Sequence, residues 1–367
     1  MLAIPERHEF LAHEFDAFIE LLRDIDQHTT RTLISHVDSV KLDGDSIHFR
    51  LLANGAAFSP LAIRQLCSHV SKGLWSLAAD IAGVHRSANA YDSATSIHQA
   101  IGIINDCLEL RFRAPDGLCG RDIIQNHKSG VVDGIVGPRY QLLPNHQLLE
   151  AVKEMMDSHE VPMQFYEGLL VGRRMAVTFL TEEPLVELDD GPLYGGAYFS
   201  NSEAGECGVR GATILQIGHT LRCMNKLRHL AHSGKDFIKR LGSTLAGVLH
   251  SWESTALVAK QAAEVMAKPL DLLNADDKLN KAKRTRMQTK LTKYIDKSLA
   301  EDVLRKAIFM GVEGTFVPNS VTAADIAKRQ VRDVVIMLMR DADGQYPEIR
   351  EKLERTAFDV LAKRVQL

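Results

Sequence analysis

The sequence predicts an α+β fold: a central antiparallel sheet with one inserted helix, a small N-terminal α+β module and a helical C-terminal region. The middle of the chain contains short β-prone segments that are separated by Gly, Pro and Asp, and only one helical segment interrupts them. After Thr220 the apolar residues recur at helical spacing almost throughout. A strand, a helix and then several successive strands favour an antiparallel sheet over a doubly wound parallel one.

Residues 1–105 are predicted to form the N-terminal module. Phe15, Phe18 and Leu22 recur at helical spacing near its start, and an Asp-Gly-Asp turn at residues 43–45 separates two alternating segments. The expected elements are a helix over 5–26, a hairpin with strands over 33–42 and 46–52, and a helix over 60–82.

Residues 106–250 are predicted to form the strand-rich core. Leu148, Leu149 and Val152 make an apolar stripe that predicts the inserted helix over 145–157, with Asn145 as its N-cap. The expected strands span 108–113, 134–143, 164–171, 174–181, 194–200 and 213–217.

Residues 251–367 are predicted to form the helical C-terminal region. Pro269 ends a long helical pattern that starts within the core, and Thr322 with Asp325 has the spacing of a capping box. The expected helices span 237–268, 278–311, 322–340 and 346–365.

The composition is that of an ordinary globular protein, with 367 residues of which 45% are hydrophobic and 25% charged. A formal net charge of -3 means that any nucleic-acid partner must be served by a local basic patch. The acidic start does not resemble a targeting signal, and the longest aliphatic run near the end, residues 334–339, is far shorter than the roughly 20 residues of a membrane span. The five scattered cysteines suit a reducing compartment, so a cytoplasmic protein without a membrane partner is expected.

The charge changes sign inside the core. No Lys or Arg occurs between Met175 and Val209, where seven acidic residues lie, whereas Arg210 to Arg240 contains seven basic residues and only Asp236 as an acid. A second basic block covers residues 278–306. Such blocks suit phosphate binding, and the alternative is a solvated helix face.

No recognisable catalytic motif is present: the sequence lacks GxSxG, HExxH, GxGxxG and the P-loop pattern. Cys207, His219 and Cys223 are zinc-capable and close in sequence, but their spacing matches no finger or ribbon pattern. Buried thiols are the preferred interpretation, so no catalytic residue, metal or cofactor is assigned.

Four segments carry a family resemblance. In chain order they are the run from Gly134 to Asn145 (GIVGPRYQLLPN) and the stretches from Glu167 to Val177, from Asn201 to Arg210 and from Leu221 to Asn225. They resemble, in this order, parts of the phage/plasmid-like proteins classified as domain of unknown function number nine hundred and thirty-two. The resemblance covers roughly residues 108–250 and implies a phage, prophage or plasmid context. The order of strands and helices in that family resembles the core of single-strand annealing proteins, which bind DNA along a basic groove and assemble into rings or filaments.

Two functions are expected from these observations. The first is a non-catalytic, homo-oligomeric protein that binds or anneals single-stranded DNA in recombination or replication. Tyr140 or Tyr198 would then stack on bases. The second is an oligomeric assembly protein of a mobile element, whose acidic and basic stretches pair between subunits without any nucleic acid. For the first function, the expected nucleic-acid-binding residues are Arg139, Tyr140, Arg173, Arg174, Arg210, Arg222, Lys226 and Arg228.

Overall fold

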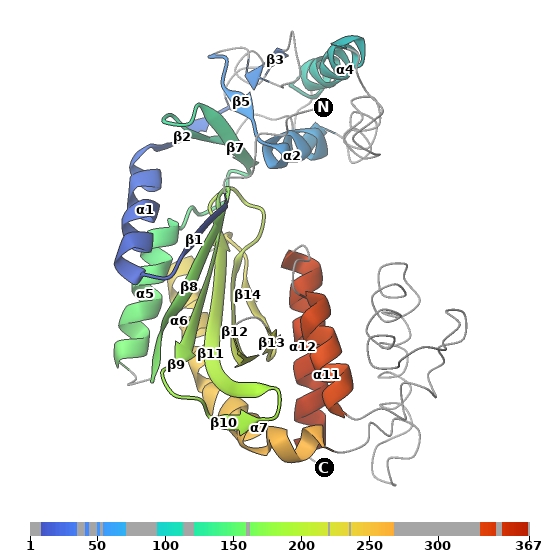
Figure 1. Ribbon diagram of the computed structural model, residues 1–367. Coiled ribbons are helices and arrows are strands. Elements are labelled where there is room, and N and C mark those ends of the chain that lie inside the picture. Colours follow the sequence, from blue (N-terminus) through green and yellow to red (C-terminus); the bar gives the residue numbers. More distant parts are fainter. Residues whose placement is uncertain are drawn as a thin grey trace, which may run out of the picture.

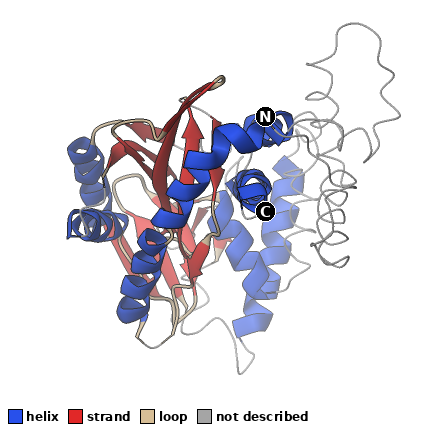
Figure 2. Ribbon diagram, turned by 90° about the horizontal axis from the view of Figure 1, so that it is seen from below, coloured by secondary structure: helices blue, strands red, loops and turns tan. Residues whose placement is uncertain are grey.

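The computed structural model has the predicted α+β fold, with two β-sheets and helices that pack against them (Figure 1). The helices and strands lie in layers when the molecule is seen from below (Figure 2). The structure describes residues 9–34, 41–43, 50–51, 54–70, 94–112, 121–158, 162–218, 221–234, 236–267, 331–342 and 347–365.

The larger sheet has eight strands, and every pair of neighbours is antiparallel, as the sequence predicts. Its main order is β1-β8-β9-β11-β12-β13, while β10 pairs with β11 and β14 pairs with β12. The strands are β1 (Glu9–Ala12), β8 (Met163–Val171), β9 (Arg174–Thr181), β10 (Val186–Leu188), β11 (Gly191–Ser202), β12 (Val209–Ile217), β13 (Leu221–Met224) and β14 (Arg228–Leu230).

The smaller sheet has six strands in the order β2-β6-β7-β5-β4-β3, and β5 pairs with β7 in parallel. Helix α2 packs on β7 and helix α4 packs on α2. The elements are β2 (Thr29–Leu33), β3 (Leu42–Asp43), β4 (Arg50–Leu51), β5 (Ala57–Phe58), α2 (Pro60–Val70), α4 (Ala94–Phe112), β6 (Asp122–Asn126) and β7 (Val131–Val136).

One face of the large sheet is apolar and covered by helices. Because side chains alternate along a strand, Val177 and Phe179 of β9 and Phe199 of β11 share this face and pack with Phe18 and Leu148 in the largest core cluster. The covering helices are α1 (Phe15–Gln27), α5 (Asn145–Ser158), α6 (Phe237–His250) and α7 (Trp252–Met266).

The last two helices lie on the other side of the large sheet from α1 and α5 (Figure 1). They are α11 (Val331–Ala342) and α12 (Pro347–Val365), which pack on each other, on β13 and on α7. Phe358 and Leu361 of α12 belong to a second apolar cluster with Val258 of α7 and Cys223 of β13. The described helices of the C-terminal region, α7, α11 and α12, therefore dock on the core. None of the helices that the structure describes is long and apolar enough to cross a membrane.

A tight turn between β8 and β9 fixes the position of Arg173. Val171 pairs with Arg174, so the hairpin loop contains only Gly172 and Arg173. Gly172 has a φ of 60°, a left-handed conformation that glycine adopts without steric cost, and such turns place glycine first. The turn directs Arg173 away from the strands, towards the smaller sheet.

Several predicted bounds of helices and strands differ from those in the structure. Residues 108–113 were predicted as a strand, but Leu108 continues the buried stripe of Ile101 and Ile104 and lies in helix α4. The predicted helix over 5–26 begins as strand β1 and becomes helical at Phe15. A break at Ser251 divides the predicted helix over 237–268.

Strands from each of the two predicted modules also join the sheet of the other module. Strand β1 joins the large sheet, whereas β6 and β7 join the small sheet. The predicted strand over 134–143 is strand only to Val136. Residues 278–311, predicted as a helix, and most of the predicted hairpin between residues 35 and 49 lie outside the described residues.

Close packing of α1 on the large sheet gives a first prediction. A Cβ atom added at Gly168 of β8 would lie 2.5 Å from ring atoms of Phe18, so Gly168→Ala should lower the free energy of unfolding by about 1–3 kcal/mol. Gly242 of α6 has open space around the same atom, so Gly242→Ala should instead raise it by about 0.5–1 kcal/mol. Urea unfolding of both variants tests this; equal effects would contradict the packing of α1.

Candidate nucleic-acid interface

The eight residues predicted to bind nucleic acid do not form one surface. Three arginines, Arg174, Arg210 and Arg222, lie on the face of the large sheet opposite to its apolar core. Arg173 lies buried between the two sheets, and Arg228 lies on the other side of the sheet against Gly247 of α6. Arg139 is exposed in the turn after β7, Tyr140 is partly buried beside it, and Lys226 is exposed between β13 and β14.

The three arginines share their face with three tyrosines. Register pairs Tyr198 of β11 with Ala212 and Thr178, and it pairs Gln216 with Arg222, so these side chains alternate with the apolar core residues. The Arg222 guanidinium lies 4.7 Å from the centre of the Tyr198 ring in a cation–π contact. We call this surface the tyrosine–arginine face. It comprises Tyr166, Arg174, Tyr194, Tyr198, Arg210 and Arg222.

Carboxylates of α12 pair with the arginines of this face. Glu351 accepts from Arg174 at 3.0 Å and from Arg210 at 2.5 Å. Glu354 accepts from Arg222 at 3.0 Å. Sequence reasoning missed both glutamates, because nothing in the local pattern of a C-terminal helix reveals which distant strand its acidic residues will meet.

Burial and nearby charges shift the pKa of Glu351 and of Arg222. Burial raises the pKa of Glu351, although Arg210 and Arg174 lower it. Burial works against the charge of Arg222, but Glu354 and Tyr198 outweigh it and raise the pKa of this arginine. Arg222 therefore keeps its charge on a covered face, and it needs an anionic partner there.

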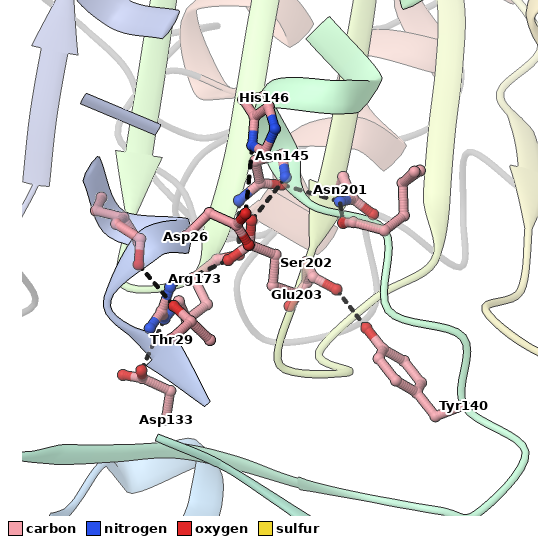
Figure 3. Close-up of polar contacts among 12 residues, drawn as sticks. Asp26, Thr29, Asp133, Tyr140, Asn145, His146, Arg173, Asn201, Ser202 and Glu203 are labelled. Atoms are coloured by element: carbon pink, nitrogen blue, oxygen red, sulfur yellow. Dashed lines mark hydrogen bonds and ion pairs between the residues drawn. The ribbon is translucent and has the colours of Figure 1, made fainter. Parts of the chain in front are cut away.

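A second cluster of polar residues lies where the two sheets meet (Figure 3). Arg173 donates from Nε to Asp133 Oδ2 at 2.7 Å and from Nη1 to Glu203 Oε2 at 3.1 Å. The other oxygen of Glu203 accepts from the backbone N–H of Asn145 at 2.6 Å. Asp133 belongs to β7 of the small sheet and Arg173 to a turn of the large sheet, so the ion pair joins them. Burial raises the pKa of both Asp133 and Glu203, and Arg173 opposes the rise.

The same cluster continues through amides to a histidine. Asn201 donates from Nδ2 to the Leu143 carbonyl and to Asn145 Oδ1, both at 2.9 Å. His232 bonds to Asn201 Oδ1 at 2.7 Å and to the Gln141 carbonyl at 2.8 Å. Burial lowers the pKa of His232, while the bond to Gln141 opposes this. These bonds satisfy the chain around the start of α5 and fix its position on the sheet.

Tyr140 has a structural position in this cluster. Its hydroxyl donates to the Ser202 carbonyl at 2.6 Å, and its ring stacks on His232 with the centres 4.9 Å apart. Burial raises the pKa of the Tyr140 hydroxyl. The ring is thus occupied by a protein partner in the described conformation, and it does not belong to the tyrosine–arginine face.

The zinc-capable residues do not assemble into a site in the part of the chain that the structure describes. Cys223 packs in the apolar cluster of α7 and α12, and Cys207 is a buried free thiol. His219 lies outside the described residues. Among those that are described, no group of three or more His, Cys, Asp or Glu side chains could hold a metal ion.

Comparison with known proteins adds no relative. No protein-family model, curated protein or solved structure matches this chain. The resemblance to a phage/plasmid-like family therefore stays a prediction from the sequence.

The buried ion pair of Arg173 gives a second prediction. Arg173→Met leaves Asp133 and Glu203 without their shared cation, so the free energy of unfolding should fall by about 3–5 kcal/mol at neutral pH. Arg23→Met is the matched control, because Arg23 and Glu150 are both about half exposed and such pairs contribute less than about 1 kcal/mol.

The deficit of Arg173→Met should shrink as the pH is lowered. A carboxyl group whose pKa is raised in the folded state destabilises the fold above its unfolded pKa, and proton uptake removes that cost. Urea unfolding at neutral pH and at about pH 5 tests the sign. A deficit that grows in acid would contradict it.

Tyr140 gives a third prediction. Tyr140→Phe keeps the ring stacked on His232 and removes only the bond to Ser202, so it should cost about 1 kcal/mol of stability. Thermal unfolding compares it with Tyr194→Phe, which removes a hydroxyl from a partly exposed residue and should cost close to nothing. If the Tyr140→Phe protein is fully folded but no longer binds nucleic acid, the hydroxyl has a role in binding and not only in stability.

Proposed function

We propose that the protein binds single-stranded nucleic acid, with single-stranded DNA as the preferred ligand, on the tyrosine–arginine face and without catalysis. One observation supports this most: three guanidinium groups and three tyrosine rings share one face of an antiparallel sheet whose other face is covered by helices. Arginines neutralise phosphates in any sequence, and aromatic rings stack on unpaired bases. A sheet that offers both on one surface suits an unpaired strand.

The members of this face differ in how easily a ligand reaches them. Tyr166 and Tyr194 are partly exposed, whereas Tyr198 is buried at 5% exposure. Arg210 is the most accessible of the three arginines, with 16% of its side chain exposed. An entering strand would therefore meet Tyr166, Tyr194 and Arg210 first. Phosphates that reach Arg174 and Arg222 must replace the carboxylates of α12.

The wider context of the proposal comes from the sequence. The resemblance to phage/plasmid-like proteins supports a role in recombination or replication of a mobile element, and the likeness to single-strand annealing proteins supports assembly into a homo-oligomer. The free thiols of Cys107, Cys207 and Cys223 support a reducing, cytoplasmic setting.

The assembly reading has less support from the charges. It expected the acidic stretch before Val209 to pair with basic residues of a neighbouring subunit. Within one chain, Glu203 already pairs with Arg173, and Asp190 pairs with Arg332 of α11 at 2.7 Å. These pairs use part of the acidic stretch, so it is not wholly available to a second subunit.

The proposal predicts a salt-dependent affinity for a thirty-nucleotide oligo(dT). Three phosphate contacts should give a plot of log affinity against log salt with a slope of about -2, since each contact on a single strand contributes roughly 0.7. Arg210→Ala should lower the slope by about 0.7 and leave Glu351 paired with Arg174. Tyr194→Ala should weaken binding by about 1–3 kcal/mol, which is typical of one stacked base. Fluorescence anisotropy measures both effects.

Arg23→Ala serves as the control, because Arg23 lies on α1, which covers the opposite face of the sheet. Oligo(rU) and duplex DNA of equal length separate DNA from RNA and single from double strands. No binding to any of the three, or an equal loss in the Arg23 variant, would contradict the proposal. If the Arg210→Ala variant changes its oligomeric state in size-exclusion chromatography and no nucleic acid binds, the alternative function as an oligomeric assembly protein would be favoured.

A further inference from the structure

The first half of α12 places two carboxylates on the three arginines, at the N–H donors that phosphates would otherwise use. Glu351 bridges Arg174 and Arg210, and Glu354 bridges Arg222 and Arg350. A guanidinium group recognises a carboxylate and a phosphate through the same N–H donors. The two acids therefore occupy the donors that a nucleic-acid strand would need.

The second half of α12 is held by different forces. Ala357, Phe358 and Leu361 are buried in the apolar cluster with α7 and α11. The fully buried apolar contacts of the helix thus lie one to three turns beyond the carboxylates, and Leu353 adds only a partly buried contact between them. If the first turns open, this anchor stays in place, so exposure of the arginines does not require the loss of the whole helix.

The ion pairs beneath the first turns of α12 leave one buried carboxylate oxygen without a hydrogen bond. Glu354 Oε2 is buried, and it has no hydrogen-bond partner among the residues that the structure describes. Such an oxygen costs free energy, and a buried ion pair adds little net stability even when complete. Glu206 acts on Arg174 more weakly than Glu351 does, and Glu167 acts on Arg222 more weakly than Glu354 does, so opening would leave both arginines with weaker negative charge nearby.

We propose that the first half of α12 is an acidic latch that competes with nucleic-acid phosphates for Arg174, Arg210 and Arg222. This inference rests on the proposed function. Its consequence is that the affinity for single strands is set by two equilibria, the opening of residues 347–356 and the binding of the strand. A strand binds only the open form, so it shifts the population towards that form.

Neutralising the latch tests the competition. The double variant Glu351→Gln and Glu354→Gln should bind oligo(dT) about tenfold or more tightly than the wild-type protein, because the competitor loses its charge. The matched control is Glu20→Gln with Glu253→Gln, which makes the same change in net charge at two exposed sites on α1 and α7. The control pair should change the affinity by less than about threefold.

Hydrogen exchange on the wild-type protein provides an independent reading. Oligo(dT) should speed exchange of the amides in residues 347–356 and leave those around Phe358 and Leu361 protected. This measurement applies even if the double glutamine variant folds poorly, which circular dichroism would reveal.

The outcomes separate the latch from the binding function. If neither the wild-type protein nor any variant binds, the proposed function fails and the latch fails with it. If the wild-type protein binds and the glutamine pair matches the control pair, or if oligo(dT) protects residues 347–356, the binding face stands and the latch is overturned. Tighter binding together with faster exchange in these residues supports the latch.

Discussion

Three arginines on a covered sheet face need anionic partners, and the first turns of α12 supply them. Arg174 comes from β9 and Arg210 and Arg222 come from β12 and β13, and the register places all three on one face. A buried guanidinium without a partner is costly, so Glu351 and Glu354 must meet them or phosphates must replace those glutamates. The ion pairs of α12 and the proposed phosphate contacts thus answer the same requirement, while the apolar cluster with α7 and α11 holds the second half of the helix.

The second polar cluster solves a related problem at the junction of the two sheets. Arg173 lies in a two-residue turn, with Asp133 from one sheet and Glu203 from the other as its partners. The bonds of Asn145, Asn201 and His232 extend it to the start of α5. The segments that carry the family resemblance contribute to both polar surfaces. They contain Tyr140, Asn145, Asn201 and Glu203 of this cluster and also Arg210 and Arg222 of the tyrosine–arginine face.

Sequence reasoning identified strands β8 and β9 and helix α5 almost to the residue, because their alternation, helical stripe and turn signals are local. It failed where the local signal was ambiguous, as at Leu108, whose β-prone neighbours hide a helical stripe. It also grouped eight residues as one binding surface on charge and aromatic character. Five of them, Arg139, Tyr140, Arg173, Lys226 and Arg228, lie away from the face that holds the other three.

The sequence by itself determined the fold class, the antiparallel character of the main sheet and the strong reversal of charge around Val209, since period, turn residues and composition are properties of the chain. Only the tertiary structure decided which arginines face the same way and which carboxylates they meet. Glu351 lies 141 residues after Arg210, and pairing over such a distance depends on strand register and helix docking. Neither can be read from neighbouring residues, because a shift of one residue along a strand moves a side chain to the opposite face.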